Sequence, residues 1–348
     1  MTDEMFLDKR DVLLLKRETS YGSDPTPAAT DAQFITEVNS DLDSTPIEVD
    51  GIAAFAPGWR GVPGPKTPKL DFGTLMGPSY VTDANSRVGC DGALAAMGFA
   101  IPTYAAGPPK TLTYTRPSAG GSASATAYHY KSDHLATSAA ERIIEGYRAN
   151  GSFSWRWDDV FRVAVADGAG TSWAESPQTM PTAVYLDPEG NHYMPFVGTR
   201  FVLATLDTDE AAPTSFGGAM LGGSIDLNLG LEIDRGCSVA GLPIRVRHRP
   251  GRFTGTIQIE RVPIADFDPR TYRDTGVGLA LTPQFVSAQD ANLTLDIPME
   301  IEIVTVGESF ADGRAVWDIA YRSLYPDTGS GAGVSPAADL TLVFTNNT

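Results

Sequence analysis

Three residues in one short stretch of the sequence could hold a metal ion. His129 and His134 flank Asp133, and imidazole and carboxylate groups together can bind a divalent cation. The stretch lacks the Glu-x-x-His or His-Glu-x-x-His spacing that brings metal ligands onto one helix face. We therefore expect these histidines to lie in surface loops, without a metal ion.

The other patterns that could support catalysis are incomplete. Asp83, Asn85 and Arg87 begin like a calcium-binding loop, but arginine stands where an oxygen ligand belongs and no glutamate closes the loop. The sequence contains no phosphate-binding loop, no Gly-x-Ser-x-Gly motif and no dinucleotide fingerprint. We expect no catalytic residues and no cofactor, and we expect that the protein is not an enzyme.

Two cysteines and several aromatic residues have structural explanations. Cys90 and Cys237 cannot form a metal cluster alone; we expect free buried thiols, with a disulfide as the alternative. Aromatic residues in clusters suit either a core and an interface or a platform for sugar rings, and we favour the former for Trp155, Trp157, Phe161 and Trp317.

Arginines alternate along one predicted strand. Arg245, Arg247 and Arg249, followed by Arg252, place positive charge on one strand face. This pattern predicts either contact with an acidic neighbouring subunit or a solvated edge strand.

The composition predicts a folded chain with an acidic surface. The chain has 348 residues, 42% of them hydrophobic, and a net charge of −17. Such a charge repels DNA and anionic membranes, so we expect neither to be bound tightly. No apolar run reaches the ~18 residues that a transmembrane helix requires. Met1–Glu4 is acidic, which favours synthesis without a secretion signal.

The predicted fold class is mainly β. Apolar and polar residues alternate over 227–234, 253–260, 299–303 and 317–322, as in strands with one buried and one solvated face. Helical spacing occurs over Asn85–Met97 and Ile264–Thr275. Ser138–Glu145 fits either a helix or a strand.

An apparent internal repeat predicts two tandem units. Asn39–Gly51 aligns with Gly223–Gly236, since both contain Asp-Leu, then Glu-Val/Ile-Asp, then Gly. Each copy continues with a strand, a short helix and a hairpin; the predicted hairpins are 141–147 with 151–165, and 300–306 with 308–321. The predicted division is an N-terminal arm and first strand (1–38), a β domain (39–180), a connection (181–222) and a second β domain (223–348).

One N-terminal stretch carries a resemblance to a known family. Val12–Pro27 (VLLLKRETSYGSDPTP) resembles the opening arm of tail tube proteins, the major tail proteins of long-tailed, siphophage-like bacteriophages. Further segments resemble that family in the same order: Leu94–Phe99, Thr111–Thr115, Gly151–Ala166, Ser224–Val262 and Asp339–Thr345. The resemblance implies tandem tail-tube-type β-sandwich or barrel units, each with a short flanking helix.

The function implied by this resemblance is structural. Tail tube proteins form stacked rings whose lumen conducts DNA during ejection into the host and holds the tape measure protein, while distal tail and tail terminator proteins cap the tube. The implied location is the tail of the virion, assembled in the host cytoplasm without a membrane. A duplicated chain implies a trimeric pseudo-hexamer; an unduplicated one implies a hexamer. The alternative function is a carbohydrate-binding or adhesion β-sandwich module of a phage tail tip.

Specific residues follow from this expectation. Only one arm exists for two units, so we expect it to pack across a subunit or ring boundary instead of completing its own core. The candidate assembly residues are Leu14, Arg17, Tyr21, Trp59, Arg245, Arg247 and Arg249. The candidate lumen-facing acids, which could equally be ordinary solvated positions, are Asp226, Glu232, Asp234, Glu260, Glu300 and Glu302.

Overall fold

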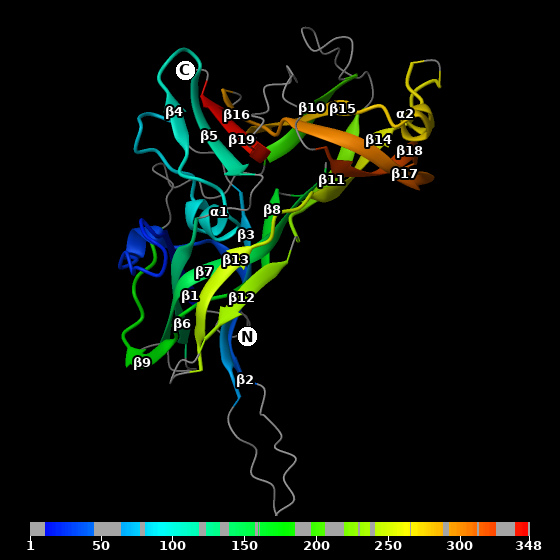
Figure 1. Ribbon diagram of the computed structural model, residues 1–348. Helices are drawn as coiled ribbons and strands as arrows, with labels where there is room; N and C mark the ends of the chain where they lie inside the picture. The colour runs from blue at the N-terminus through cyan, green and yellow to red at the C-terminus, as the bar shows by residue number, and fades with distance from the viewer. Residues whose placement is uncertain are drawn as a thin grey trace, which may run out of the picture.

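A computed structural model shows two β-rich bodies stacked on each other (Figure 1). It describes residues 11–44, 64–76, 81–117, 123–132, 139–156, 159, 161–184, 196–205, 219–228, 230–236, 241–264, 266–287, 292–311, 313–324 and 338–346. These residues form nineteen strands, two α-helices and a single 3₁₀ turn (Ala29–Asp31). The predicted mainly β fold with short helices is confirmed.

The first body, which we call unit 1, is a sandwich of two antiparallel layers. One layer has the order β1–β6–β7–β9 and the other has the order β2–β3–β8–β7, so the long strand β7 belongs to both. The strands are β1 (Val12–Arg17), β2 (Ile35–Ser44), β3 (Lys66–Leu75), β6 (Ala125–Ser132), β7 (Ala139–Arg156), β8 (Arg162–Ala169) and β9 (Ala174–Gln178).

The second body, unit 2, repeats this arrangement. One layer has the order β10–β15–β16–β19 and the other has the order β11–β14–β18–β17, with β17 also pairing with β15. The strands are β10 (Phe196–Thr205), β11 (Met220–Asp226), β14 (Thr254–Glu260), β15 (Leu279–Ser287), β16 (Leu293–Asp296), β17 (Met299–Ala311), β18 (Arg314–Ser323) and β19 (Ala338–Asn346). Strand β10 falls within the segment that the sequence predicts as a connection.

The register of the strands also recurs. In β2 the pairing with β3 shifts between Ile35 and Glu37, and in β11 the pairing with β14 shifts between Met220 and Gly222. Superposing these two bulges places Asp41-Leu42 on Asp226-Leu227, which is the same match that the sequence repeat predicts. In the closing hairpins the strand pairings place the equivalent residues two positions away from the match expected from sequence.

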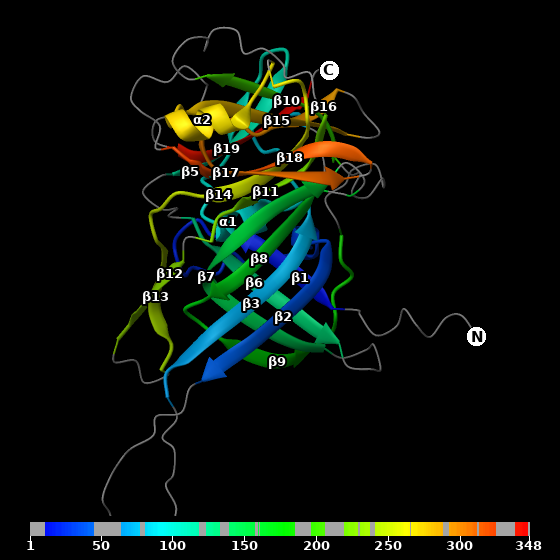
Figure 2. The ribbon, with the colours of Figure 1, turned by 90° about the vertical axis from the view of Figure 1, so that its right-hand side faces the viewer.

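Strand pairing joins the two units at two places. The C-terminal half of β7 pairs antiparallel with β11, so one sheet runs β2–β3–β8–β7–β11–β14–β18–β17. We call this the long sheet, and its unit 1 strands face the viewer in Figure 2. In the other layer, β5 (Lys110–Pro117), which also pairs with β4 (Thr103–Ala105), extends unit 2 by pairing with β19. A separate hairpin, β12 (Leu231–Arg235) with β13 (Pro243–His248), lies beside β7 (Figure 1).

Both helices are shorter than predicted. Helix α1 spans Asp91–Ala96, because the residues before it form a turn in which the Asn85 N–H donates to Asp83 Oδ1 at 2.8 Å. Helix α2 spans Pro269–Thr275; Asp268 caps its start and Gly276, with φ of 68°, ends it as predicted.

One predicted strand break is absent and one stretch predicted as a continuous strand is broken, for reasons that involve glycine. The predicted turn between 147 and 151 is absent, since β7 runs unbroken to Arg156. A Cβ on Gly151 would lie 2.0 Å from Met97 Sδ, so this glycine permits close packing against the end of α1. Conversely, the alternation over 227–234 does not form one strand, because β11 ends at Asp226 and Gly230 has φ of 81°.

Candidate assembly surface

The N-terminal motif is a buried polar centre within unit 1. Glu18 is 7% exposed, and its carboxylate accepts hydrogen bonds from the Gly22 and Gly146 N–H groups and from the Ser124 and Thr126 hydroxyls, at 2.5–2.8 Å. Four donors offset the cost of burying one charge. Glu18 was not among the predicted site residues, although its place inside a polar run after three leucines was a usable indication.

The arm completes its own core, so the expectation that it packs across a boundary instead is wrong for β1. Leu14 is 2% exposed and packs against Tyr128, Tyr130 and Ala139, because β1 pairs along its whole length with β6. Arg17 is also satisfied within the chain: Nη2 lies 2.9 Å from Asp91 Oδ1, and Nη1 donates to the Phe99 carbonyl at 2.6 Å.

Tyr21 makes a contact of another kind, with the separate β12–β13 hairpin. Its hydroxyl accepts a hydrogen bond from the Val246 N–H of β13 at 2.6 Å, and the Arg148 guanidinium lies 4.5 Å from its ring centre. Arg148 also donates to the Val246 carbonyl at 2.8 Å. Burial lowers the pKa of Arg148, while the nearby Tyr21 and Glu18 partly oppose that shift. The motif thus holds the separate β12–β13 hairpin against unit 1.

One face of the long sheet carries polar side chains in all eight strands, although the register also places Leu75 and Val316 on it. The pairing register places its side chains together, and cross-strand contacts tie them: Ser224 Oγ lies 2.8 Å from Thr256 Oγ1, and Gln258 donates to Asp318 at 2.7 Å. This polar sheet face includes Glu37, Asn39, Asp41, Lys69, Asp71, Arg162, Ala164, Ser152, Ser154, Ser224, Asp226, Thr254, Thr256, Gln258, Glu260, Asp318, Ala320, Arg322, Glu302 and Thr305.

The polar sheet face is hollowed where the two units meet. A depression of about 560 Å³ is lined by side chains from both units, including Ser154, Arg162, Thr256, Gln258 and Asp318. Most side chains of the face are short, and acids outnumber bases among them. The polar sheet face therefore has the composition of a solvated, weakly anionic wall, interrupted by this depression.

The predicted lumen-facing acids separate into three groups. Asp226, Glu260 and Glu302 lie on the polar sheet face, where Glu302 pairs with Arg322 at 2.9 Å and Glu260 lies 3.6 Å from Arg314. Glu300 is 5% exposed, so burial keeps it from the solvated wall. The remaining two acids, Glu232 and Asp234, belong to the β12–β13 hairpin, outside the long sheet.

The predicted arginines share that hairpin. Arg245, Arg247 and Arg249 are exposed, and Arg247 forms an ion pair with Asp234 at 2.7 Å. The hairpin therefore neutralises part of its own charge. Trp59, the remaining candidate for assembly, lies outside the described residues.

The junction between the units is buried and aromatic. Trp155 of β7 is 4% exposed, stacks on Phe161 with centroids 5.7 Å apart, and meets Phe285 of unit 2 edge-on at 5.3 Å. Gly223 of β11 lies directly opposite Trp155, and a Cβ there would lie 2.5 Å from Trp155 Cζ2. Glycine makes room for the indole.

The two outer strands of the long sheet have open edges among the described residues. Strand β2 pairs with β3 alone, and β17 beyond Ile301 pairs with β18 alone. On β17, Phe310 is 84% exposed, the highest value among the large apolar side chains in the described part of the chain. Sequence alternation could have assigned its face, but not its exposure.

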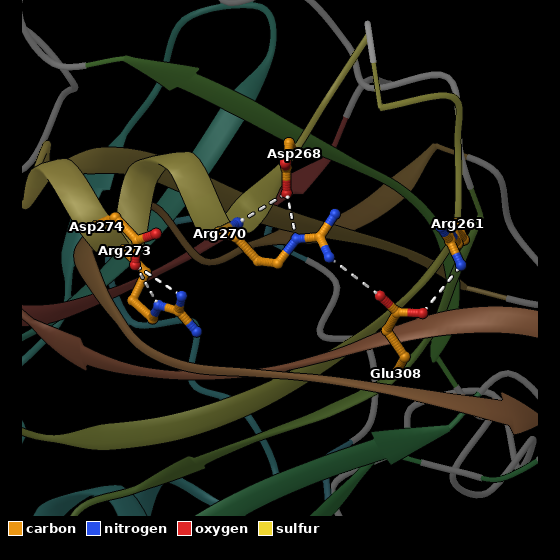
Figure 3. A network of polar contacts seen from close by, with 6 residues as sticks. All are labelled: Arg261, Asp268, Arg270, Arg273, Asp274 and Glu308. Atoms are coloured by element: carbon orange, nitrogen blue, oxygen red, sulfur yellow. Dashed lines mark hydrogen bonds and ion pairs between the residues drawn. The ribbon is translucent and has the colours of Figure 1, made fainter.

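A charged network accompanies this edge (Figure 3). Glu308 of β17 pairs with Arg261 at 3.0 Å and with Arg270 at 3.4 Å, and both guanidinium groups lie 5.0 Å from the Trp317 ring centre. The hydrogen bond from Arg270 lowers the pKa of Asp268, the cap of α2. Charge at a sheet edge disfavours indiscriminate strand pairing.

Of the three residues first considered as metal ligands, His129 makes structural contacts within unit 1. His129 is 2% exposed in β6, contrary to the expected surface position, and its Nδ1 lies 2.6 Å from Ser40 Oγ. Cys90 is free and buried, as predicted, and burial raises the pKa of its thiol to about 12. His134 and Cys237 lie outside the described residues. Where the structure describes the chain, it groups no three His, Cys, Asp or Glu residues suitably for a metal ion, and no described helix is long and apolar enough to span a membrane.

Comparison with known proteins gives no family assignment. The sequence matches no protein-family model and no curated protein.

Proposed function

We propose that this protein is the structural subunit of a bacteriophage tail tube, which polymerises through its sheet edges into stacked rings. The observation that carries the proposal is the long sheet: it crosses both units, presents one polar face, and ends on each side in a strand edge that is open among the described residues. Open edges invite strand addition, and closure of a sheet into a ring removes them. The resemblance of Val12–Pro27 to tail tube arms supports the same function.

The repeated strand order supports a tandem duplication of the tail-tube-type unit. Five antiparallel pairings of unit 1 have direct counterparts in unit 2, and the pairing of β16 with β19 takes the place of the pairing of β7 with β9. The bulges of β2 and β11 also align with the repeated Asp-Leu pair. A ring of six units then requires three chains, in a trimeric pseudo-hexamer. Mass per unit length measured by scanning transmission electron microscopy distinguishes three chains per ring from six.

The polar sheet face is the proposed wall of the lumen. Short polar side chains and a net acidic character give DNA phosphates little to bind, so DNA and a tape measure protein can slide past. Tail terminator and distal tail proteins then meet the two ends of the stacked rings. This role requires neither catalysis nor a cofactor.

Negative-stain electron microscopy of the concentrated, purified protein tests the function. Hollow tubes or stacked rings support it. Monomers that persist at all concentrations and bind glycans would instead favour the adhesion module, for which the hollow on the polar sheet face is the place to look.

A further inference from the structure

The internal junction provides a guide to how two chains would meet. We propose that β17 of one copy pairs antiparallel with β2 of a second copy, in the register that β7 and β11 adopt within one chain. The partner is thus a second copy of this chain. The inference deepens the proposed tube function and rests on it for its biological setting.

The pairing pattern defines which residues of the two units are equivalent. In unit 2, Ser309 pairs with Val316, which pairs with Glu260 of β14. In unit 1, Ser154 pairs with Arg162, which pairs with Leu75 of β3. The aligned bulges of β2 and β11 place β3 on β14, so Ser309 is the counterpart of Ser154.

The same alignment gives the partner residue on the other edge. Asn39 of β2 pairs with Asp71, as Ser224 of β11 pairs with Thr256. Within the chain, Ser154 and Ser224 are directly opposed. The inferred contact between copies therefore places Ser309 opposite Asn39, with both side chains on the polar sheet face.

One residue further along, the exposed aromatic acquires a partner. The internal pair Trp155 and Gly223 corresponds to Phe310 and Val38. A large ring opposite glycine becomes a smaller ring opposite a branched side chain, so the two pairs fill comparable space. Trp155 is 4% exposed and Phe310 is 84% exposed. A second copy would bury Phe310 as unit 2 buries Trp155.

The Ser40 carbonyl on the edge of β2 already accepts a hydrogen bond, which the pairing must accommodate. Arg142 Nη1 donates to the Ser40 carbonyl at 2.6 Å. Ser40 would face Glu308, and a carbonyl oxygen has two lone pairs, so this hydrogen bond can be shared with an incoming strand.

Disulfide trapping tests the register. Opposed residues of an antiparallel pair have Cα atoms ~4.5–5.5 Å apart, within reach of a disulfide. The full-length double variant Ser309→Cys/Asn39→Cys should give a ladder of covalent oligomers on a non-reducing gel after mild oxidation. The two positions lie at opposite sides of an eight-stranded sheet, roughly 30 Å apart at ~4.8 Å per strand, so the cross-link joins separate chains.

Matched controls distinguish cross-linking in the proposed register from random cross-linking between chains. Each single cysteine variant reports any reaction with the native cysteines. The pair Ser309→Cys/Asp41→Cys, displaced by two residues, should cross-link far less, since diagonal neighbours lie ~7–8 Å apart. Equal or stronger cross-linking of the displaced pair overturns the register, as does no cross-linking in a sample that sedimentation shows to be oligomeric. A sample without oligomers at any concentration overturns the pairing itself.

The cross-linking experiment tests this pairing separately from the proposed tube function. If the protein forms tubes but the Ser309–Asn39 cross-link does not form, the proposed function is supported and this pairing is refuted. If the cross-link forms but tubes never do, the pairing is supported and the proposed function is not. As an independent readout, Phe310→Ala should weaken self-association ~10- to 100-fold, as expected for a central aromatic contact, whereas Ile101→Ala, at another exposed apolar side chain (63%), should not. Unchanged association of Phe310→Ala contradicts the proposal.

Discussion

The junction inside the chain and the open edge of β17 are built on equivalent strands but differ in chemistry. At the junction both Phe153 and Trp155 are buried; the Trp155 ring meets Phe285 of unit 2, and the Phe153 ring packs against Phe99 and Phe161. At the open edge their counterparts are Glu308, held by two arginines, and the exposed Phe310 (Figure 3). The edge of β7 is thus part of the buried core, while the edge of β17 has one exposed apolar side chain among charged residues. Charged residues beside an unpaired strand disfavour non-specific strand pairing before a matching edge binds.

Truncation of the two equivalent aromatic residues should have the largest and most unequal effects. Trp155→Ala removes a buried ring from the junction and should lower the free energy of unfolding by about 3–5 kcal/mol. Phe310→Ala, in the monomer, should change it by no more than about 0.5 kcal/mol, because the ring is exposed. Guanidinium denaturation at a concentration that keeps the protein monomeric measures both. Similar losses of unfolding free energy for both variants would show that the junction and the open edge do not differ as proposed.

Replacement of the buried carboxylate of the N-terminal motif should have the next largest effect on the free energy of unfolding. Glu18→Gln replaces an acceptor of four hydrogen bonds with an amide whose NH₂ group faces donors, and the loss should be about 1.5–3 kcal/mol. Glu175→Gln is the matched control, since this half-exposed carboxylate forms only a surface ion pair with Arg142 at 3.4 Å. Urea denaturation of the two variants makes the comparison. An equal effect in both would mean that Glu18 does not anchor the arm.

Two glycines test how tightly each region is packed. A Cβ at Gly223 would lie 2.5 Å from the Trp155 ring, so Gly223→Ala should destabilise the protein by about 1–3 kcal/mol. At the open edge, a Cβ at Gly307 would meet only Asp318, at 3.6 Å, so Gly307→Ala should be neutral or stabilising by about 0.4–1 kcal/mol. Thermal unfolding of both variants measures the difference. Equal tolerance at both positions would show that the junction is loosely packed.

Period-2 alternation predicted the strands well where one face is buried along its whole length, as in Thr254–Glu260 and Arg314–Ser323. The strand prediction failed at two glycines, because the sequence does not show which structural role a glycine has. Gly151 permits close packing within a continuous strand, whereas Gly230 permits a bend between two strands.

The candidate surface was harder to predict, because alternation assigns a side chain to a face but does not say what covers that face. Leu14 and Phe310 both follow a strand pattern, yet β6 pairs alongside Leu14 and nothing in the described part of the chain covers Phe310. Long-range pairing decides such cases. Likewise, Glu302 reaches the polar sheet face while Glu300, two residues earlier on the same strand, is buried.

The smallest expected effect concerns the charged network at the open edge. Glu308→Gln removes ion pairs with Arg261 and Arg270, whose side chains are more than a third exposed, so the monomer should lose no more than about 1 kcal/mol. Its counterpart in unit 1, Phe153, is fully buried, and Phe153→Ala should cost about 3–5 kcal/mol. Salt sharpens the contrast, because a screened surface pair contributes less at high ionic strength while apolar burial does not weaken. Denaturation at ~0.05 and ~1 M sodium chloride, where the Debye length falls to about 3 Å, should therefore erase the Glu308→Gln effect and leave the Phe153→Ala effect intact. A Glu308 effect that persists in high salt would show that this edge is already packed as core.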